Sequence, residues 1–164
     1  MKQRTVLVTC VDKYMGRAIV DRLTELDFRV LTDTQALVEQ SQCEELVRSV
    51  GEVDILIANL AEPPRSSPVQ AIQNEDWTTL FSTLVDPLMF LVRAITPQML
   101  DRQSGKIIAV TSAAPLKGLA NNASYCAARG AQNAFIKAVG LELARSNIQV
   151  NAIAQNYINN NTYY

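Results

Sequence analysis

Short runs of aliphatic and β-branched residues alternate with longer segments of helical periodicity, and this alternation constrains the fold more than any other feature of the chain. Segments 15–26, 43–50, 74–102 and 123–145 have helical character. Short apolar runs joined through helices are typical of buried parallel strands. We therefore predict an α/β fold, a doubly wound parallel sheet, in one domain spanning residues 1–164. The expected strands are Thr5–Thr9 (TVLVT), Phe28–Leu31, Asp54–Ala58 (DILIA), Lys106–Thr111 (KIIAVT) and Gln149–Ile153.

Two features of this pattern depart from a full doubly wound sheet. The segment between Phe28–Leu31 and Asp54–Ala58 is too short to hold a helix, a strand and a second helix. The chain also stops at Tyr164, just past a strand, which would leave a hydrophobic sheet edge without a partner. We expect that a C-terminal part is absent from this sequence.

Composition excludes several classes of function. Lys and Arg number 15 and Asp and Glu 16, for a net charge of −1 without any basic cluster, so we expect no nucleic-acid partner. The chain has no histidine, which rules out histidine-based triads and histidine zinc sites. Its three cysteines form no Cys-x-x-Cys pair, which favours a reducing cytoplasm. Pro, Arg or Asp interrupts the apolar runs, so we expect no membrane span.

The turn after the first strand, TCVDKYMG, lies where a dinucleotide-binding protein needs glycines to admit a pyrophosphate. Only Gly16 remains, and Cys10 and Tyr14 stand where the other glycines would be. Tyr14 would fill the space of the pyrophosphate, and Asp12 would repel it. Asp33 lies about 20 residues downstream, where a ribose-binding carboxylate is found, but a residue at such a position is more often a solvated turn aspartate. We predict that no dinucleotide binds.

Three residues suggest acid–base chemistry. Ser112 ends a strand, and Tyr125 and Arg129 lie one turn apart on the helix that follows. A free tyrosine has a pKa near 10 and is a poor base, but a guanidinium about 4 Å away stabilises the phenolate by about 4 kcal/mol at an effective dielectric of about 20. Tyrosine and arginine at this spacing more often form a helix-surface contact. A serine on the preceding strand makes the arrangement more specific, because it can hold a substrate oxygen while the tyrosinate takes its proton.

With these residues the chain resembles the short-chain dehydrogenase/reductase superfamily, which has a Rossmann-like fold, and more closely its halohydrin dehalogenases. The resemblance is carried by Asn59 after DILIA, by ITPQM before SGKIIAVTS, by Ser112 with YCAAR, by the turn VTCVDKYMG and by the ending IAQNYINNNTYY. Dehydrogenases of the superfamily carry Tyr-x-x-x-Lys; here Arg129 takes the place of the lysine, as in the dehalogenases. The similarity spans nearly all of the chain, although family members continue beyond its end.

The resemblance implies a cofactor-independent enzyme that converts a vicinal haloalcohol to an epoxide and a halide. Tyr125 would be the base, Arg129 its activator, and Ser112 would hold the substrate oxygen. The reaction is reversible in the family, so azide, cyanide or nitrite would open epoxides. The family also implies a homo-oligomer, a dimer or tetramer assembled through the long helices. The residues implied for the halide site are Tyr14, Gln155, Asn156, Tyr157 and Ile158.

Other interpretations stay open at this point. Tyr14 can be a core aromatic residue, Tyr157 can cover the sheet edge, and Gln155 and Asn156 can satisfy loop backbone groups. For the whole chain, Asp33 and the fold favour an NAD(P)-dependent oxidoreductase as the first alternative. A catalytically inactive scaffold that serves in oligomerisation is the second.

Overall fold

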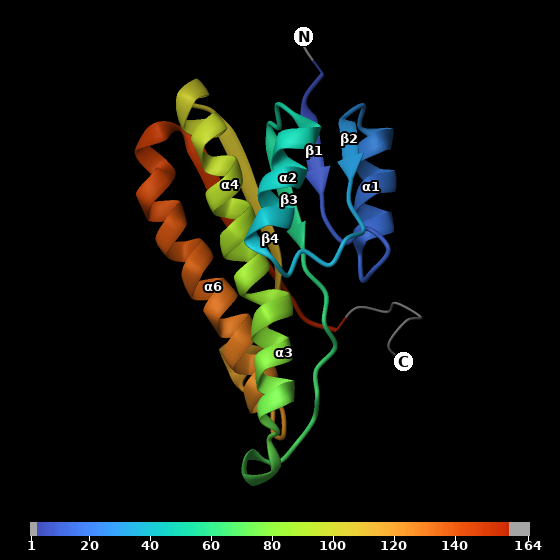
Figure 1. Ribbon diagram of the computed structural model, residues 1–164, viewed down its shortest axis with the longest axis vertical. Coiled ribbons are helices and arrows are strands. Elements are labelled where there is room, and N and C mark those ends of the chain that lie inside the picture. Colours follow the sequence, from blue (N-terminus) through green and yellow to red (C-terminus); the bar gives the residue numbers. More distant parts are fainter. Residues whose placement is uncertain (1–2, 158–164) are drawn as a thin grey trace.

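The computed structural model describes residues 3–157 and contains a sheet of five parallel strands in the order β2-β1-β3-β4-β5 (Figure 1). The predicted Rossmann-like, doubly wound α/β fold is confirmed. The strands are β1 (Thr5–Val8), β2 (Arg29–Thr32), β3 (Ile55–Asn59), β4 (Gly105–Ser112) and β5 (Ile148–Gln155). The helices are α1 (Gly16–Glu25), α2 (Gln40–Val50), α3 (Asn74–Leu84), α4 (Asp86–Arg102), α5 (Ala114–Lys117) and α6 (Ala123–Leu143), with single 3₁₀ turns at Val69–Ala71 and Ala144–Ser146.

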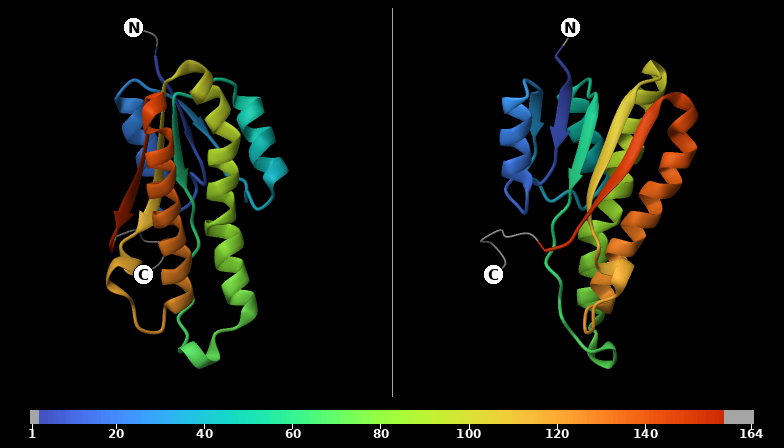
Figure 2. Two further views of the ribbon diagram at one scale, coloured as in Figure 1. Left: turned by 90° about the vertical axis from the view of Figure 1, so that its left-hand side faces the viewer. Right: turned by 180° about the vertical axis from the view of Figure 1, so that it is seen from behind.

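Helices cover both faces of the sheet, which explains why its inner strands are apolar without alternation (Figure 2). Helix α1 packs on one face, where Val8 and Ile57 belong to a small apolar cluster. Helices α2, α3, α4 and α6 form the main core with the other face, including Leu7, Leu56 and Ile107. As predicted, only one helix, α2, lies between β2 and β3.

The long helical segment at 74–102 is two helices, α3 and α4, that meet at Val85. Pro87 lacks the backbone N–H that would continue the helical hydrogen bonds, which accounts for the break at this point. By length and composition alone, the segment is apolar enough to cross a membrane, contrary to our expectation that every such run is interrupted. Here it packs Leu80, Leu88 and Ile95 into the core, as a core helix does.

Strand β5 lies at one edge of the sheet and pairs with β4 alone within residues 3–157. Its Ile153 side chain is 51% exposed. The unpaired apolar edge expected from the sequence is therefore present in the described part of the chain.

Candidate active site

The carboxyl ends of the strands bring together the turn after β1, the ends of β3, β4 and β5, and the first turns of α6. Parallel α/β sheets bind their ligands at this edge. The structure places Tyr14, Asn59, Ser112, Tyr125 and Gln155 on these elements.

Tyr125 and Arg129 form a buried pair on α6. The Nε–H of Arg129 donates to the Tyr125 hydroxyl oxygen at 3.1 Å, and the guanidinium carbon lies 5.3 Å from the centre of the tyrosine ring. Arg129 is only 1% exposed, so the pair is no helix-surface contact. The expected one-turn spacing thus becomes a direct hydrogen bond away from water.

Arg129 is buried without a carboxylate. Its Nη1 donates to the Val110 carbonyl at 3.3 Å and to Oε1 of Gln132 at 2.9 Å, and no acidic side chain within residues 3–157 pairs with it. Buried charges are normally paired, because removal from water is costly. The positive charge of Arg129 is therefore balanced by no fixed anion, and it favours any group beside it that becomes negative.

The buried network continues through Gln132, which the sequence did not mark as a functional residue. Nε2 of Gln132 donates to the Leu84 carbonyl at 2.5 Å, where α3 ends. The only signal in the sequence is a polar residue on the inner face of a helix. Its partner lies far away along the chain, so spacing alone cannot reveal the role.

Ser112, the last residue of β4, is buried at the same edge. Its Oγ accepts from the Ala114 N–H at 3.1 Å, and its carbonyl accepts from Nδ2 of Asn133 at 3.2 Å. Within residues 3–157 no hydrogen bond joins Ser112 to Tyr125. The hydroxyl proton of Ser112 is likewise not donated to any described residue, so it is available to an oxygen of a bound molecule.

The turn after β1 has the backbone shape of a glycine-rich turn, although residues other than glycine stand at two of its positions. Cys10 (φ 48°) and Tyr14 (φ 50°) both lie in the left-handed region that favours glycine. Gly16 is required, because a Cβ there would come within 2.4 Å of the Val11 Cα. The positions where glycines were expected are thus recognisable from the backbone.

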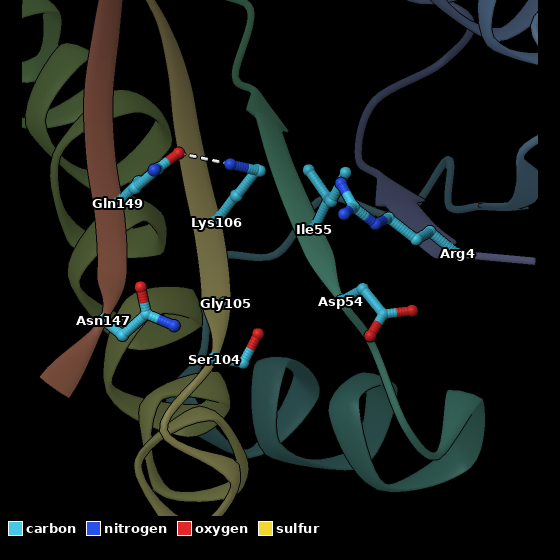
Figure 3. A pocket seen from close by; sticks show the side chains of 8 residues that line it. All are labelled: Arg4, Asp54, Ile55, Ser104, Gly105, Lys106, Asn147 and Gln149. Atoms are coloured by element: carbon cyan, nitrogen blue, oxygen red, sulfur yellow. Dashed lines mark hydrogen bonds between the residues drawn. The ribbon is translucent and has the colours of Figure 1, made fainter. Parts of the chain in front are cut away.

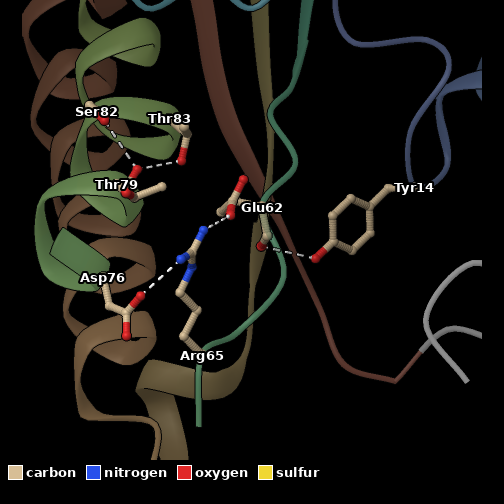
Figure 4. Close-up of polar contacts among 7 residues, drawn as sticks. All are labelled: Tyr14, Glu62, Arg65, Asp76, Thr79, Ser82 and Thr83. Atoms are coloured by element: carbon tan, nitrogen blue, oxygen red, sulfur yellow. Dashed lines mark hydrogen bonds and ion pairs between the residues drawn. The ribbon is translucent and has the colours of Figure 1, made fainter. Parts of the chain in front are cut away.

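Tyr14 reaches from this turn to the buried pair. Its hydroxyl donates to the Glu62 carbonyl at 3.2 Å, and its ring centre lies 6.0 Å from the guanidinium carbon of Arg129. Glu62 in turn accepts from Arg65, which also binds Asp76 of α3 (Figure 4). Arg129 therefore has the rings of two tyrosines close to its guanidinium group.

Asn59, at the end of β3, holds the turn in place. Its Nδ2 donates to the Cys10 carbonyl at 2.9 Å and to the Lys13 carbonyl at 3.0 Å. Its Oδ1 is buried and has no hydrogen-bond partner in the described structure. Asn59 is one of the residues that carry the family resemblance, but its place in the sequence does not indicate this role.

The residues after the last strand differ in how they lie. Gln155 is opposite Ser112 in the β4–β5 pair, its carbonyl accepts from the Ala113 N–H at 2.7 Å, and its Oε1 is buried without a partner. Asn156 is exposed, and Tyr157 is 78% exposed, so neither is packed into the site. Ile158 lies outside the described residues.

A dinucleotide does not fit the residues of the first turn. Tyr14 occupies a position where the pyrophosphate needs a bare backbone, and Asp12 adds a negative charge there. Asp33 is only 6% exposed, so the interpretation as a solvated turn aspartate is wrong. Burial raises the pKa of Asp33, although its Oδ2 accepts from the Gln35 N–H at 3.2 Å. Its buried carboxylate directly follows β2, where a ribose-binding carboxylate is found in dinucleotide-binding proteins.

A pocket lies at the opposite edge of the sheet, around Arg4, Asp54, Lys106 and Gln149 (Figure 3). Several of its polar groups already bind one another or the backbone. Lys106 donates to Gln149, and Asp54 accepts from the Thr5 N–H at 2.7 Å. We therefore place the candidate site at the carboxyl edge.

Residues 32–163 match the short chain dehydrogenase family, and the chain belongs to this family. The match begins after the turn at 9–16. An acetoacetyl-CoA reductase of Acinetobacter sp. (strain RA3849) is 32% identical over 114 residues, 70% of this chain and 46% of that protein. A gluconate 5-dehydrogenase of Gluconobacter oxydans (strain 621H) is 31% identical over 127 residues, 77% of this chain and 48% of that protein. The chain thus spans about half the length of these curated relatives.

Two solved structures are similar to the chain over most of its length. One is described as a dehalogenation enzyme, with a TM-score of 0.89 and 28% identity, covering 99% of this chain and 75% of that one. The other is a halohydrin dehalogenase bound to ethyl (2S)-oxiran-2-ylacetate, with a TM-score of 0.83 and 30% identity, covering 92% of this chain and 69% of that one.

Proposed function

We propose that this protein is a cofactor-independent halohydrin dehalogenase, which converts vicinal haloalcohols to epoxides and halide. Tyr125 is the base, Arg129 stabilises its phenolate, and Ser112 holds the substrate oxygen. In the reverse direction, azide, cyanide or nitrite opens an epoxide in the same pocket. The similarity to two dehalogenase structures supports this proposal.

The buried Arg129 carries the proposal. Among the described residues its guanidinium has no carboxylate partner, and it donates to the Tyr125 hydroxyl oxygen, so its positive charge lies beside the atom that carries the negative charge of the phenolate in the proposed mechanism. Such a phenolate is suited to remove a proton from an alcohol. Hydride transfer would also need a bound nicotinamide dinucleotide, and Tyr14 and Asp12 in the first turn do not suit its pyrophosphate.

In the proposed reaction the Tyr125 phenolate takes the hydroxyl proton of the haloalcohol. The oxygen lone pair then forms a C–O bond to the neighbouring carbon, while the C–halogen bond breaks and its electron pair leaves with the halide. Ser112 donates a hydrogen bond to the reacting oxygen and keeps its own proton. Atoms and charge balance without an oxidant or a reductant, and the proton on Tyr125 returns to water after the products leave.

The leaving halide needs partners with partial positive charge. The ring of Tyr14 beside Arg129 supports a halide position near the first turn. Gln155, Asn156, Tyr157 and Ile158 are the further halide-site residues in this proposal. With Tyr157 exposed as it is, binding of the halide would have to bring this residue inward.

An NAD(P)-dependent oxidoreductase is the second candidate. The buried carboxylate of Asp33 at the end of β2 favours it, and the curated relatives named above are a reductase and a dehydrogenase. Against it stand Tyr14 and Asp12 in the turn and Arg129 in place of the lysine of the dehydrogenase motif.

One pair of measurements separates these candidates. Halide release from aliphatic and aromatic vicinal haloalcohols, without added nicotinamide, is expected for the dehalogenase, together with no detectable NADH or NADPH binding by calorimetry. Tight nicotinamide binding with no halide release across substrates and pH values would overturn the proposal. A chain that did neither, and whose properties did not change in Tyr125→Phe, would be an inactive scaffold.

We also propose that the protein acts in the cytoplasm as a homo-oligomer built on its long helices. Its cysteines are all free thiols, as a reducing compartment allows. Helix α6 carries a series of small residues, among them Ala127, Gly130, Ala131 and Ala134, that permit close helix contact. Light scattering of the purified protein tests the dimer or tetramer against a monomer.

A further inference from the structure

Resting on the proposed function, we propose that Gln132 is a positioning residue that fixes Arg129 against Tyr125 while leaving the arginine's charge free for the phenolate. Gln132 does not touch the phenol itself. It acts through the guanidinium group, at the end of a buried chain of hydrogen bonds from Tyr125 to the junction of α3 and α4.

The orientation of the Gln132 amide is fixed by its two partners. Arg129 can only donate and the Leu84 carbonyl can only accept, so Oε1 must face the guanidinium and Nε2 must face Leu84. The side chain is 1% exposed, and water therefore cannot easily replace either bond. This arrangement holds Arg129 in one geometry, with its Nε directed at the phenol.

The Leu84 carbonyl is available because the helix breaks beside it. Val85 separates α3 from α4, and within residues 3–157 no backbone N–H donates to the Leu84 oxygen across the break. A buried carbonyl without a donor costs free energy. Gln132 meets that requirement and so connects the break in the long helical segment to the catalytic pair.

A neutral amide suits this position better than a carboxylate or an apolar group. Glutamate would accept from Arg129 equally well, but its negative charge would compensate the guanidinium and compete with the phenolate. An apolar side chain would leave Arg129 able to shift. Gln132 combines rigid positioning with zero charge.

The test compares Gln132→Glu and Gln132→Met with Gln98→Glu as a matched control. Gln98 on α4 also accepts from an arginine on its own helix, Arg102, at 3.0 Å, but it lies near the amino end of β3. Gln98→Glu therefore makes the same change of charge and the same Gln-to-Glu change beside an arginine, outside the site.

We expect Gln132→Glu to lower kcat for halide release roughly 100-fold and Gln132→Met to lower it roughly tenfold. In both variants KM should change about twofold or less. Gln98→Glu should leave kcat and KM unchanged. The ultraviolet absorbance of phenolate that is lost in Tyr125→Phe should also fall in Gln132→Glu at a fixed alkaline pH. This second readout needs no substrate. A folded Gln132→Glu with unchanged phenolate absorbance and unchanged kcat would overturn the inference.

If Gln132→Glu does not fold, Gln132→Met, which matches the glutamine in length, decides the question by the same two readouts. Absence of halide release from the unaltered protein would overturn the proposed function. The phenolate absorbance would still decide the role of Gln132, so the two failures are distinguishable.

Discussion

The turn after β1 and the start of α6 meet at the same edge of the sheet, yet only α6 carries the side chain that the family's motif requires. In the turn the backbone has the shape of a glycine-rich loop, with Cys10 and Tyr14 at positive φ, but its side chains no longer suit a pyrophosphate. On α6, by contrast, the tyrosine of the family's motif is present and buried, with Arg129 hydrogen-bonded to it.

The difference shows that backbone shape and ligand chemistry can change independently. Part of what fixes the turn does not involve the side chains at positions 10 and 14: Gly16 packs on Val11, and Asn59 binds two backbone carbonyls. The Tyr14 side chain adds a contact of its own, because its hydroxyl donates to the Glu62 carbonyl. In the proposed mechanism the Tyr125 hydroxyl on α6 cannot be replaced, because it carries out the proton transfer.

The largest expected effect comes from removing the reacting hydroxyl. Tyr125→Phe should lower halide release roughly 1,000-fold, because general-base catalysis contributes about 10²–10⁴-fold. Cys126→Ala, at the next position of α6, is the control and should retain activity. Steady-state halide release with each folded variant is the measurement, and activity of Tyr125→Phe near that of the unaltered protein would remove Tyr125 from the mechanism.

Restoring the lysine of the dehydrogenase motif tests whether α6 alone decides the chemistry. Arg129→Lys should lower halide release roughly 100-fold, because one ammonium cannot reproduce the directed bonds to Tyr125, Val110 and Gln132. It should bring no NADH binding by calorimetry, since the turn is unchanged. Arg93→Lys, on an exposed part of α4, is the control. NADH binding by Arg129→Lys would show that the turn does not exclude the dinucleotide.

Gly16→Ala tests whether close packing of Gly16 on Val11 fixes the backbone of the turn after β1. The added Cβ would meet the Val11 backbone at 2.4 Å, and we expect a loss of about 1–3 kcal/mol in the free energy of unfolding. Gly130→Ala on α6, where the nearest atom would be 3.4 Å away, should be neutral or stabilising. Urea denaturation of both variants measures the difference, and equal stabilities would mean that the turn is not fixed by this contact.

The smallest effect concerns the thiol that replaces a glycine in the turn. Burial raises the pKa of Cys10, and likewise of Cys43, to about 11. Only the thiolate reacts with disulfide reagents, so at pH 8 these two should react slowly while the partly exposed Cys126 is modified. Their labelling should accelerate as pH rises toward 11 or when the protein is unfolded. Rapid labelling of all three thiols in the folded protein at pH 8 would contradict this assignment.

The sequence predicts the elements well because strand burial and helix periodicity are local properties. TVLVT, DILIA and KIIAVT become inner strands, and the segments of helical periodicity become helices. The one-turn spacing of Tyr125 and Arg129 likewise reveals a pair, although only the structure shows that the pair is buried and that no carboxylate within residues 3–157 binds it.

Other parts of the site depend on contacts between distant segments, which spacing does not encode. Asn59 and Gln132 bind backbone oxygens 46–49 and 48 residues away along the chain. Asp33 looks like a turn aspartate in sequence, yet the fold buries it. The sequence likewise does not indicate that Tyr157, close to the last strand, is exposed.

The bond between Tyr14 and residue 62 has a practical consequence for protein engineering. The tyrosine hydroxyl binds a main-chain oxygen, so the identity of the side chain at position 62 is irrelevant to that bond. Positions 62 and 65, joined to each other at the surface, can therefore be randomised together in a library while the aromatic ring keeps its anchor. The loop that follows β3 can thus be varied in side-chain identity while Tyr14 stays bound to its main chain.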